Sequence, residues 1–97
     1  MKYVLTEAAI EDVREIVNYI KADSPRNARK VALKLREQFR RIARTPGIGH
    51  VREELHDDRL RVSSVYRYLI IYDVTQRPLP ILRVIHGARN LNWVRPH

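Results

Sequence analysis

Two apolar stripes with helical spacing follow each other in the first half of the chain, and they limit its fold more than any other feature. The first stripe consists of Ile10, Val13, Ile16, Val17 and Ile20. The second stripe consists of Ala28, Val31, Ala32, Leu35, Phe39 and Ile42. Apolar residues that recur every three or four positions are typical of amphipathic helices with one buried face. The sequence therefore predicts two consecutive helices.

The residues at the ends of the stripes predict a helical hairpin. Thr6 is a suitable N-cap for the first helix. Ser24 and Pro25 end that helix and start the next, because serine caps a helix well and proline fits its first position. The segment 45–49, with one proline and two glycines, ends the second helix. Helices joined by so short a connection lie antiparallel and share one apolar face, which another element must cover.

The remaining segments predict a sheet that covers this face. A short strand is expected at 2–5, and three further strands, rich in β-branched and aromatic residues, are expected at 59–63, 66–74 and 81–85. The turns between the last three strands are expected around Val65 and over 76–80. The predicted fold is a single α+β domain over 1–97, in which an N-terminal strand and an antiparallel helical hairpin pack on a C-terminal antiparallel sheet.

Strand parity predicts which faces of the sheet are covered. In the first of the three C-terminal strands, Leu60 and Val62 share one face, while Arg59, Arg61 and Ser63 share the other. This strand is therefore expected to be half-exposed, with an arginine side. The next two strands are apolar on both faces, which indicates central positions or a second covering element.

The charge of the chain indicates an acidic macromolecular partner. Nineteen Lys and Arg residues against eleven Asp and Glu give a net charge of +8. The second helix concentrates this charge, because it contains eight cations and Glu37 as its one acid. A solvated helix face usually mixes both signs, so this excess favours contact with a partner. Direct nucleic-acid binding is not expected, because no helix-turn-helix or ribbon signature is present.

Several classes of site are not expected in this chain. The chain has no cysteine, which excludes disulfides, thiol chemistry and zinc sites made of cysteine. His50, His56, Asp57 and Asp58 lack the spacing of a metal-ligand pair, and Gly47-Ile48-Gly49 lacks the third glycine of a dinucleotide fingerprint. No metal and no cofactor are therefore expected. No window has the length of a membrane span or a secretory signal, so a cytoplasmic protein without a membrane partner is expected.

Several segments, spread over nearly the whole chain, resemble the ParE branch of the ParE/RelE superfamily of bacterial type II toxins. They are Tyr3-Val4-Leu5-Thr6 with Ala9, Asp12, Ile16 and Tyr19-Ile20, then Pro46-Gly47-Ile48-Gly49, Tyr68-Leu69-Ile70-Ile71-Tyr72 and Ile81-Leu82-Arg83-Val84-Ile85-His86-Gly87-Ala88-Arg89. The resemblance implies a toxin that is encoded beside an antitoxin and serves plasmid stabilisation. It also implies that a segment of the antitoxin wraps the toxin, and that free toxin inhibits DNA gyrase without catalysing a reaction.

Two alternatives stay open within this resemblance. The RelE branch cleaves mRNA on the ribosome, which requires cations and a group that transfers protons. This chain has Trp93 where RelE-like members have a C-terminal tyrosine, so His86 is the one residue that could act in a ribonuclease. Its parity with Leu82 and Val84 points His86 toward the helices, which favours a buried structural role. The second alternative is a degenerate homologue that binds its antitoxin but is not toxic.

The candidate site residues fall into two groups. Target binding is expected from Arg89, Trp93 and Arg95, because tryptophan and arginine often dominate binding energy; Trp93 packing back on the domain is the alternative. Arg61 and Arg83, on the expected arginine side of the sheet, belong to the same group. Antitoxin binding is expected from Arg29, Arg36, Arg40 and Arg67.

Overall fold

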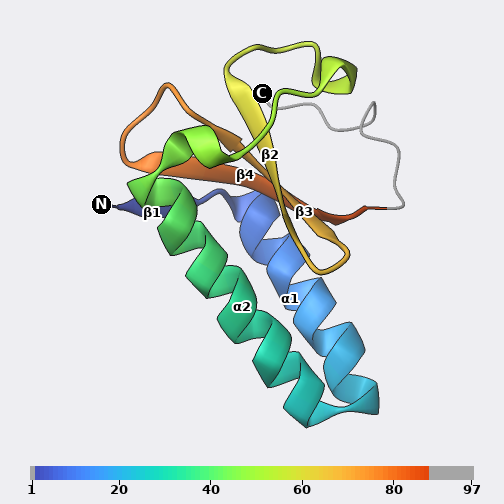
Figure 1. Cartoon of the computed structure of the whole chain (residues 1–97). Helices are drawn as coiled ribbons and strands as arrows, with labels where there is room; N and C mark the ends of the chain where they lie inside the picture. The colour runs from blue at the N-terminus through green and yellow to red at the C-terminus, as the bar shows by residue number, and fades with distance from the viewer. Residues whose placement is uncertain (1, 88–97) are drawn as a thin grey trace.

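The structure, a computed structural model, describes residues 2–87 and confirms the predicted α+β fold (Figure 1). The elements follow in the order β1 (Tyr3–Leu5), α1 (Glu7–Asp23), α2 (Pro25–Arg44), the 3-10 turns η1 (Pro46–Ile48) and η2 (Glu53–Leu55), β2 (Leu60–Val65), β3 (Tyr68–Asp73) and β4 (Leu79–His86). The two helices pack on one four-stranded sheet.

The predicted helix caps are both confirmed. The Thr6 hydroxyl accepts a hydrogen bond from the Ala9 amide at 3.1 Å, and the Ser24 hydroxyl accepts one from the Asn27 amide at 3.2 Å. Each bond satisfies one of the amides that an α-helix leaves without an internal partner at its start. The Thr6 hydroxyl also donates to the carbonyl of Leu82 at 2.9 Å, which ties the start of α1 to β4.

The sheet has the strand order β1-β4-β3-β2 and is mixed rather than purely antiparallel. β1 runs parallel to β4, whereas β2, β3 and β4 pair antiparallel in chain order. The predicted N-terminal strand therefore joins the same sheet, beside the last strand in the sequence. This arrangement puts β3 and β4 in the centre, as their two apolar faces predicted.

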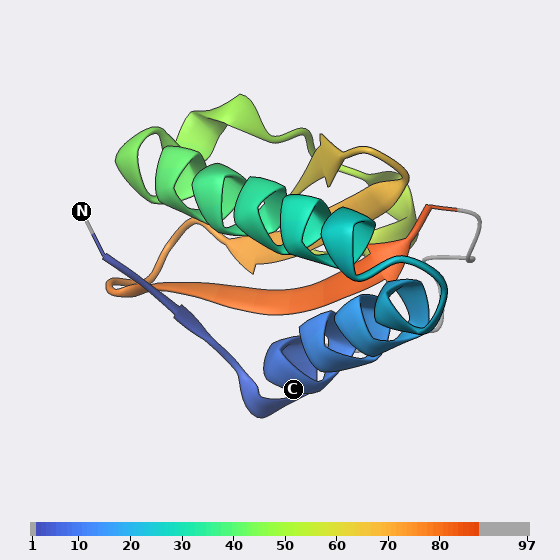
Figure 2. The same ribbon diagram turned by 90° about the horizontal axis from the view of Figure 1, so that it is seen from below.

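Both faces of the sheet are covered. On one face, Ile70, Tyr72, Ile81 and Val84 pack against α1 and α2, and Figure 2 shows the two helices on this face. On the other face, a second core contains Leu60, Val62, Leu69, Ile71 and Ile85. Leu55 of η2 packs into this second core, so β3 and β4 have both a central place and a covering element, which the strand pattern predicted as alternatives.

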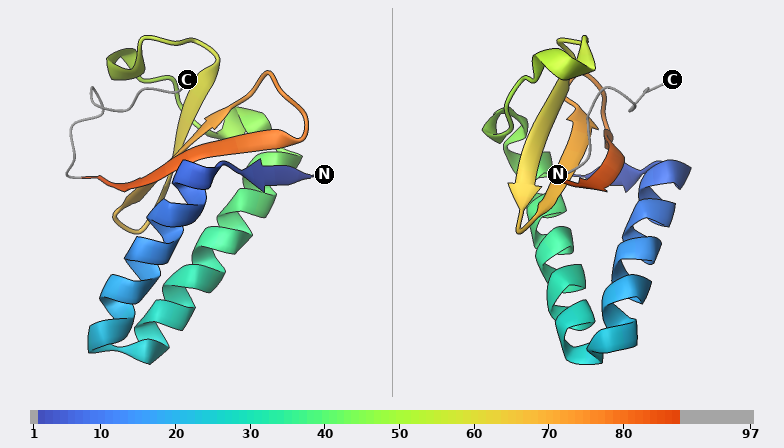
Figure 3. Two further views of the ribbon diagram at one scale, coloured as in Figure 1. Left: turned by 180° about the vertical axis from the view of Figure 1, so that it is seen from behind. Right: turned by 90° about the vertical axis from the view of Figure 1, so that its right-hand side faces the viewer.

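The helical hairpin extends well beyond the sheet, as both views in Figure 3 show. Consequently α1 has a single fully buried residue, Ala9. Every member of its predicted apolar stripe is only partly buried, and Ile10 is 44% exposed. The described part of the chain therefore does not supply enough surface to cover the stripe of α1.

The expected arginine side of the β2 strand is wrong. Ser63 points toward α2, where it is 8% exposed and accepts a hydrogen bond from the Gln38 amide group at 2.7 Å. Arg61 is half-buried, and one of its guanidinium nitrogens donates to the carbonyl of Asp58 at 2.5 Å. The face is covered because α2 reaches across to this edge strand.

Two predicted turns lie elsewhere than expected. β2 continues through Val65, and the turn consists of Tyr66 and Arg67, with Tyr66 at a φ of 53°. The segment expected as the second turn contributes Leu79 and Pro80 to β4. Pro80 is tolerated there because the last pair between β3 and β4 is Tyr72 with Ile81, so no ladder hydrogen bond to β3 is lost.

Candidate partner-binding surfaces

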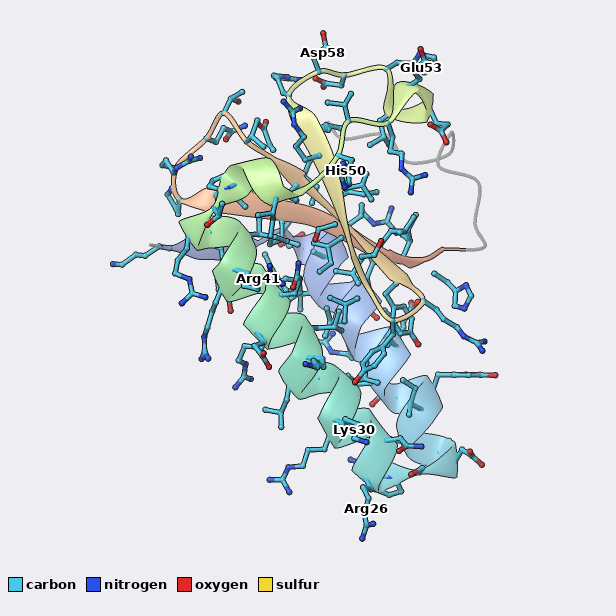
Figure 4. All side chains as sticks on the ribbon, viewed as in Figure 1. Arg26, Lys30, Arg41, His50, Glu53 and Asp58 are labelled. Atoms are coloured by element: carbon cyan, nitrogen blue, oxygen red, sulfur yellow. The ribbon has the colours of Figure 1, made fainter. Side chains whose placement is uncertain are left out.

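The exposed side of α2 forms a cationic surface. Arg29, Arg36, Arg40 and Arg44 are separated by seven, four and four residues, so they lie along one side of the helix. We call these four residues the arginine stripe. None of them takes part in the ion pairs of residues 2–87, where the cation of α2 that pairs is Lys34, with Glu37 at 4.0 Å. Figure 4 labels three neighbouring cations of α2, Arg26, Lys30 and Arg41.

The predicted antitoxin-binding residues are only partly brought together. Arg29, Arg36 and Arg40 share the arginine stripe, whereas Arg67 lies in the turn between β2 and β3. The carbonyl of Arg67 accepts a hydrogen bond from the Gly87 amide at 2.6 Å, which closes the end of β4 against this turn. The side chain of Arg67 is exposed.

Arg83 forms a bidentate ion pair with Asp12. Its guanidinium donates to both carboxylate oxygens, at 2.7 and 2.9 Å, and the Val84 amide donates to the same carboxylate at 2.9 Å. These hydrogen bonds to Asp12 raise the pKa of Arg83 above its ordinary value. The pair joins α1 to β4 and is mostly shielded, because the two side chains are 24% and 12% exposed. A target contact by Arg83 stays a prediction.

An open groove lies between α1 and β4, with a volume of about 370 Å³. Its walls carry three acids of α1, Glu11, Asp12 and Glu15. His86 lines the groove and packs edge-on against Tyr68, with 5.8 Å between ring centroids. The predicted orientation of His86 toward the helices is confirmed, but the expected burial is wrong, because its side chain is exposed at the end of β4.

The segment 46–49 is held by a residue that sequence reasoning did not single out. The Tyr72 hydroxyl donates to the Pro46 carbonyl at 2.6 Å and accepts from the Gly49 amide at 2.9 Å. Burial raises the pKa of Tyr72 above its ordinary value. A side chain on Gly49 would overlap this hydroxyl, so the glycine is required by the close approach of Tyr72. Tyrosine is common in strands, so its presence at position 72 does not indicate this anchoring role.

The polar loop before β2 contains a local ion pair. Arg59 hydrogen-bonds the Asp57 carboxylate at 3.0 and 2.7 Å, which lowers the pKa of Asp57 to about 2. Across residues 2–87, no group of three or more His, Asp or Glu side chains is placed to hold a metal ion. In the same range, no helix is both long and apolar enough to cross a membrane.

The predicted target-binding residues of the tail, Arg89, Trp93 and Arg95, lie outside the described residues. Their roles stay predictions. Arg61, from the same group, is placed on β2 with its guanidinium bonded to backbone carbonyls of Asp58 and Leu60. The structure therefore does not bring the members of this group into one described surface.

Comparisons with known proteins give the chain a family. The model of the ParE toxin of the type II toxin-antitoxin system, parDE, matches residues 3–91. A solved structure described as a chromosomal ParDE TA system from P. aeruginosa is similar in fold, with a TM-score of 0.72 at 20% sequence identity. The alignment covers 89% of this chain and 95% of that chain. No curated protein sequence matches significantly. Because the family model spans nearly the whole chain, this protein belongs to the ParE toxin family of type II toxin-antitoxin systems.

Proposed function

We propose that a cognate antitoxin neutralises this ParE-type toxin by covering the exposed side of the hairpin. The observation that carries the proposal is that α1 has an apolar stripe of which no member is fully buried. Contiguous apolar surface on a soluble domain marks a site of association. An apolar segment that folds on Val17 and Ile20, which are half-buried and outside the helix–sheet core, would extend that core over the far half of the hairpin.

Charge supports the choice of partner but supplies less of the affinity. An acidic antitoxin would meet the arginine stripe, whose members have no ion-pair partner among residues 2–87. Exposed ion pairs contribute about 0–1 kcal/mol each, whereas burying an isoleucine contributes about 1.5–3 kcal/mol. The complex should therefore weaken only moderately with salt. Affinity that collapses between low and moderate ionic strength would contradict this account.

A pair of matched double variants tests the antitoxin surface. Val17→Ser with Ile20→Ser removes apolar area from half-buried positions of α1 outside the helix–sheet core, and Asn18→Ser with Lys21→Ser makes the same spacing of changes at exposed polar positions. The probe is the cognate antitoxin. We expect the first variant to lose more than tenfold in affinity and the second less than about threefold. Equal affinities for both variants would contradict the proposed surface.

We further propose that the free toxin inhibits DNA gyrase in the cytoplasm and does not itself cleave RNA. Membership in the ParE family supports this target. The groove beside His86 supports the second part, because the one cation that lines it among residues 2–87, Arg83, is engaged by Asp12, and Glu15 would repel a phosphate placed near the imidazole. Purified toxin should slow supercoiling by gyrase or stabilise cleaved DNA. Translating ribosomes treated with it should show no new mRNA ends.

A further inference from the structure

A hollow of about 440 Å³ lies where β1 passes the C-terminal end of α2. Lys2 and Tyr3 line it from the β1 side, and Arg40 and Arg44 line it from α2. The Tyr3 ring packs on the Phe39 ring with 5.6 Å between centroids, which fixes β1 beside the helix. Figure 1 shows the start of the chain next to this end of α2. The fold thus brings three cations, from two segments far apart in sequence, to the wall of one hollow.

Among the described residues 2–87, no acid balances these cations. None of the residues that line the hollow is Asp or Glu, and the ion pairs of residues 2–87 do not include Lys2, Arg40 or Arg44. The end of α2 itself contributes only about half a negative charge. Arg41 and Arg44 both lie in the last turn, where they stabilise that partial charge, whereas Arg40 and Lys2 lie outside the last turn. Three positive charges therefore exceed what the helix needs.

The cations continue away from the hollow. Arg36 and Arg29 extend the arginine stripe down α2, so that the stripe from Arg29 to Arg44 is about 22 Å long. The position between them on the same side is Leu33, which is 55% exposed. The surface is therefore a cationic track with a concave end, and not a single charged point.

We propose that the hollow formed by Lys2, Tyr3, Arg40 and Arg44 binds a phosphate of a nucleic-acid backbone, and that the arginine stripe follows the adjoining phosphates. A phosphate offers several acceptor oxygens at one point. It can therefore accept hydrogen bonds from two guanidinium groups, an ammonium group and a phenol better than a single carboxylate can. Contacts to the sugar-phosphate backbone need no recognition helix. The lack of a helix-turn-helix or ribbon signature therefore does not exclude this kind of nucleic-acid binding. The inference goes beyond the antitoxin and gyrase roles; because the antitoxin is proposed to meet the same arginine stripe, nucleic acid and antitoxin would compete for it.

Binding of a labelled single-stranded DNA of about 20 nucleotides, measured by fluorescence anisotropy at several salt concentrations, tests this site. The pocket variant is Arg40→Gln with Arg44→Gln. The control is Lys30→Gln with Arg41→Gln, which removes the same charge from exposed positions outside the stripe on the same helix. We expect the pocket variant to lose roughly tenfold or more in affinity, with a salt slope smaller by about 1.4. The control should lose less than about threefold.

Each other outcome overturns the proposal. Equal losses in both variants would reduce the effect to net charge, and wild-type affinity in the pocket variant would remove the site. A glutamate-rich peptide with the same charge as the DNA is the second probe. If the peptide binds as tightly as the DNA, and the pocket variant loses this binding too, the site binds an acidic protein instead. Circular dichroism checks folding. Should the double variant unfold, Lys2→Gln, a change at an exposed position outside the strands, takes its place.

Discussion

Replacing Tyr72 with phenylalanine removes one oxygen atom and should loosen the connection between α2 and the sheet. Tyr72 is fully buried, and its hydroxyl bonds both Pro46 and Gly49, at 2.6 and 2.9 Å. The Gly49 amide is itself in a buried residue, so the variant leaves it without this partner. The ring stays in place, which restricts the change to the hydrogen bonds.

The expected loss of stability is about 2 kcal/mol. A buried donor or acceptor left without a partner costs about 1–3 kcal/mol, and the phenylalanine recovers part of this because it no longer buries a hydroxyl. For a domain of this size, about 2 kcal/mol lowers the melting temperature by roughly 10 °C. The effect should appear as an earlier unfolding midpoint in urea with an unchanged slope.

Thermal and urea unfolding followed by circular dichroism measure this effect. The matched control is Tyr66→Phe, because Tyr66 is 57% exposed in the turn between β2 and β3. The control should change stability by less than about 0.5 kcal/mol. If Tyr72→Phe melts within a degree or two of Tyr66→Phe, the hydroxyl does not anchor segment 46–49, and the reasoning is refuted.

Three further predictions concern other parts of the molecule. Asp12→Asn should destabilise the protein by about 2 kcal/mol in urea unfolding, because it removes the charge that pairs with the shielded guanidinium of Arg83 through two hydrogen bonds. Burial raises the pKa of Asp73, but hydrogen bonds from Thr75 and Gln76 and the charge of Arg59 outweigh it and lower the pKa overall. Asp73 therefore stabilises the fold above about pH 4, its unfolded pKa, and this contribution is lost as the pH falls through the lowered folded pKa; Asp73→Asn should flatten that part of a stability profile. Arg89→Ala with Trp93→Ala should abolish growth inhibition while melting temperature and antitoxin affinity stay unchanged; a much lower melting temperature would instead make Trp93 a core residue.

The sequence was sufficient for features that depend on local chemistry. The caps at Thr6 and Ser24 and the ends of both helices follow from short-range hydrogen bonds and backbone preferences. The two-faced apolar pattern of β3 and β4 also predicted their central place in the sheet. These features need only residues that are close together in the chain.

Features that depend on distant contacts or unusual backbone could not be predicted. Tyr66 adopts a left-handed backbone conformation, for which glycine and asparagine are the usual residues. Because Tyr66 is neither, the sequence predicts this turn too early in the chain. The pair of Asp12 and Arg83 joins residues 71 positions apart, and neither spacing nor composition indicates it. The arginine side of β2 was wrong because the reach of α2 over the edge strand is a property of the assembled layers.

The hollow at the end of α2 shows the same limit. Eight cations on one helix were evident from the sequence, but the approach of Lys2 and Tyr3 to Arg40 and Arg44 depends on the pairing of β1 with β4. Only the assembled sheet turns a charged helix face into a concave site.

The most direct test of the proposed toxin function is a supercoiling assay with purified DNA gyrase, relaxed plasmid and this protein, repeated after addition of the cognate antitoxin. The account predicts that the toxin alone slows supercoiling or leaves cleaved plasmid, and that equimolar antitoxin restores full gyrase activity. Normal supercoiling in the presence of toxin, together with new mRNA ends on translating ribosomes that vanish in His86→Ala, would contradict it.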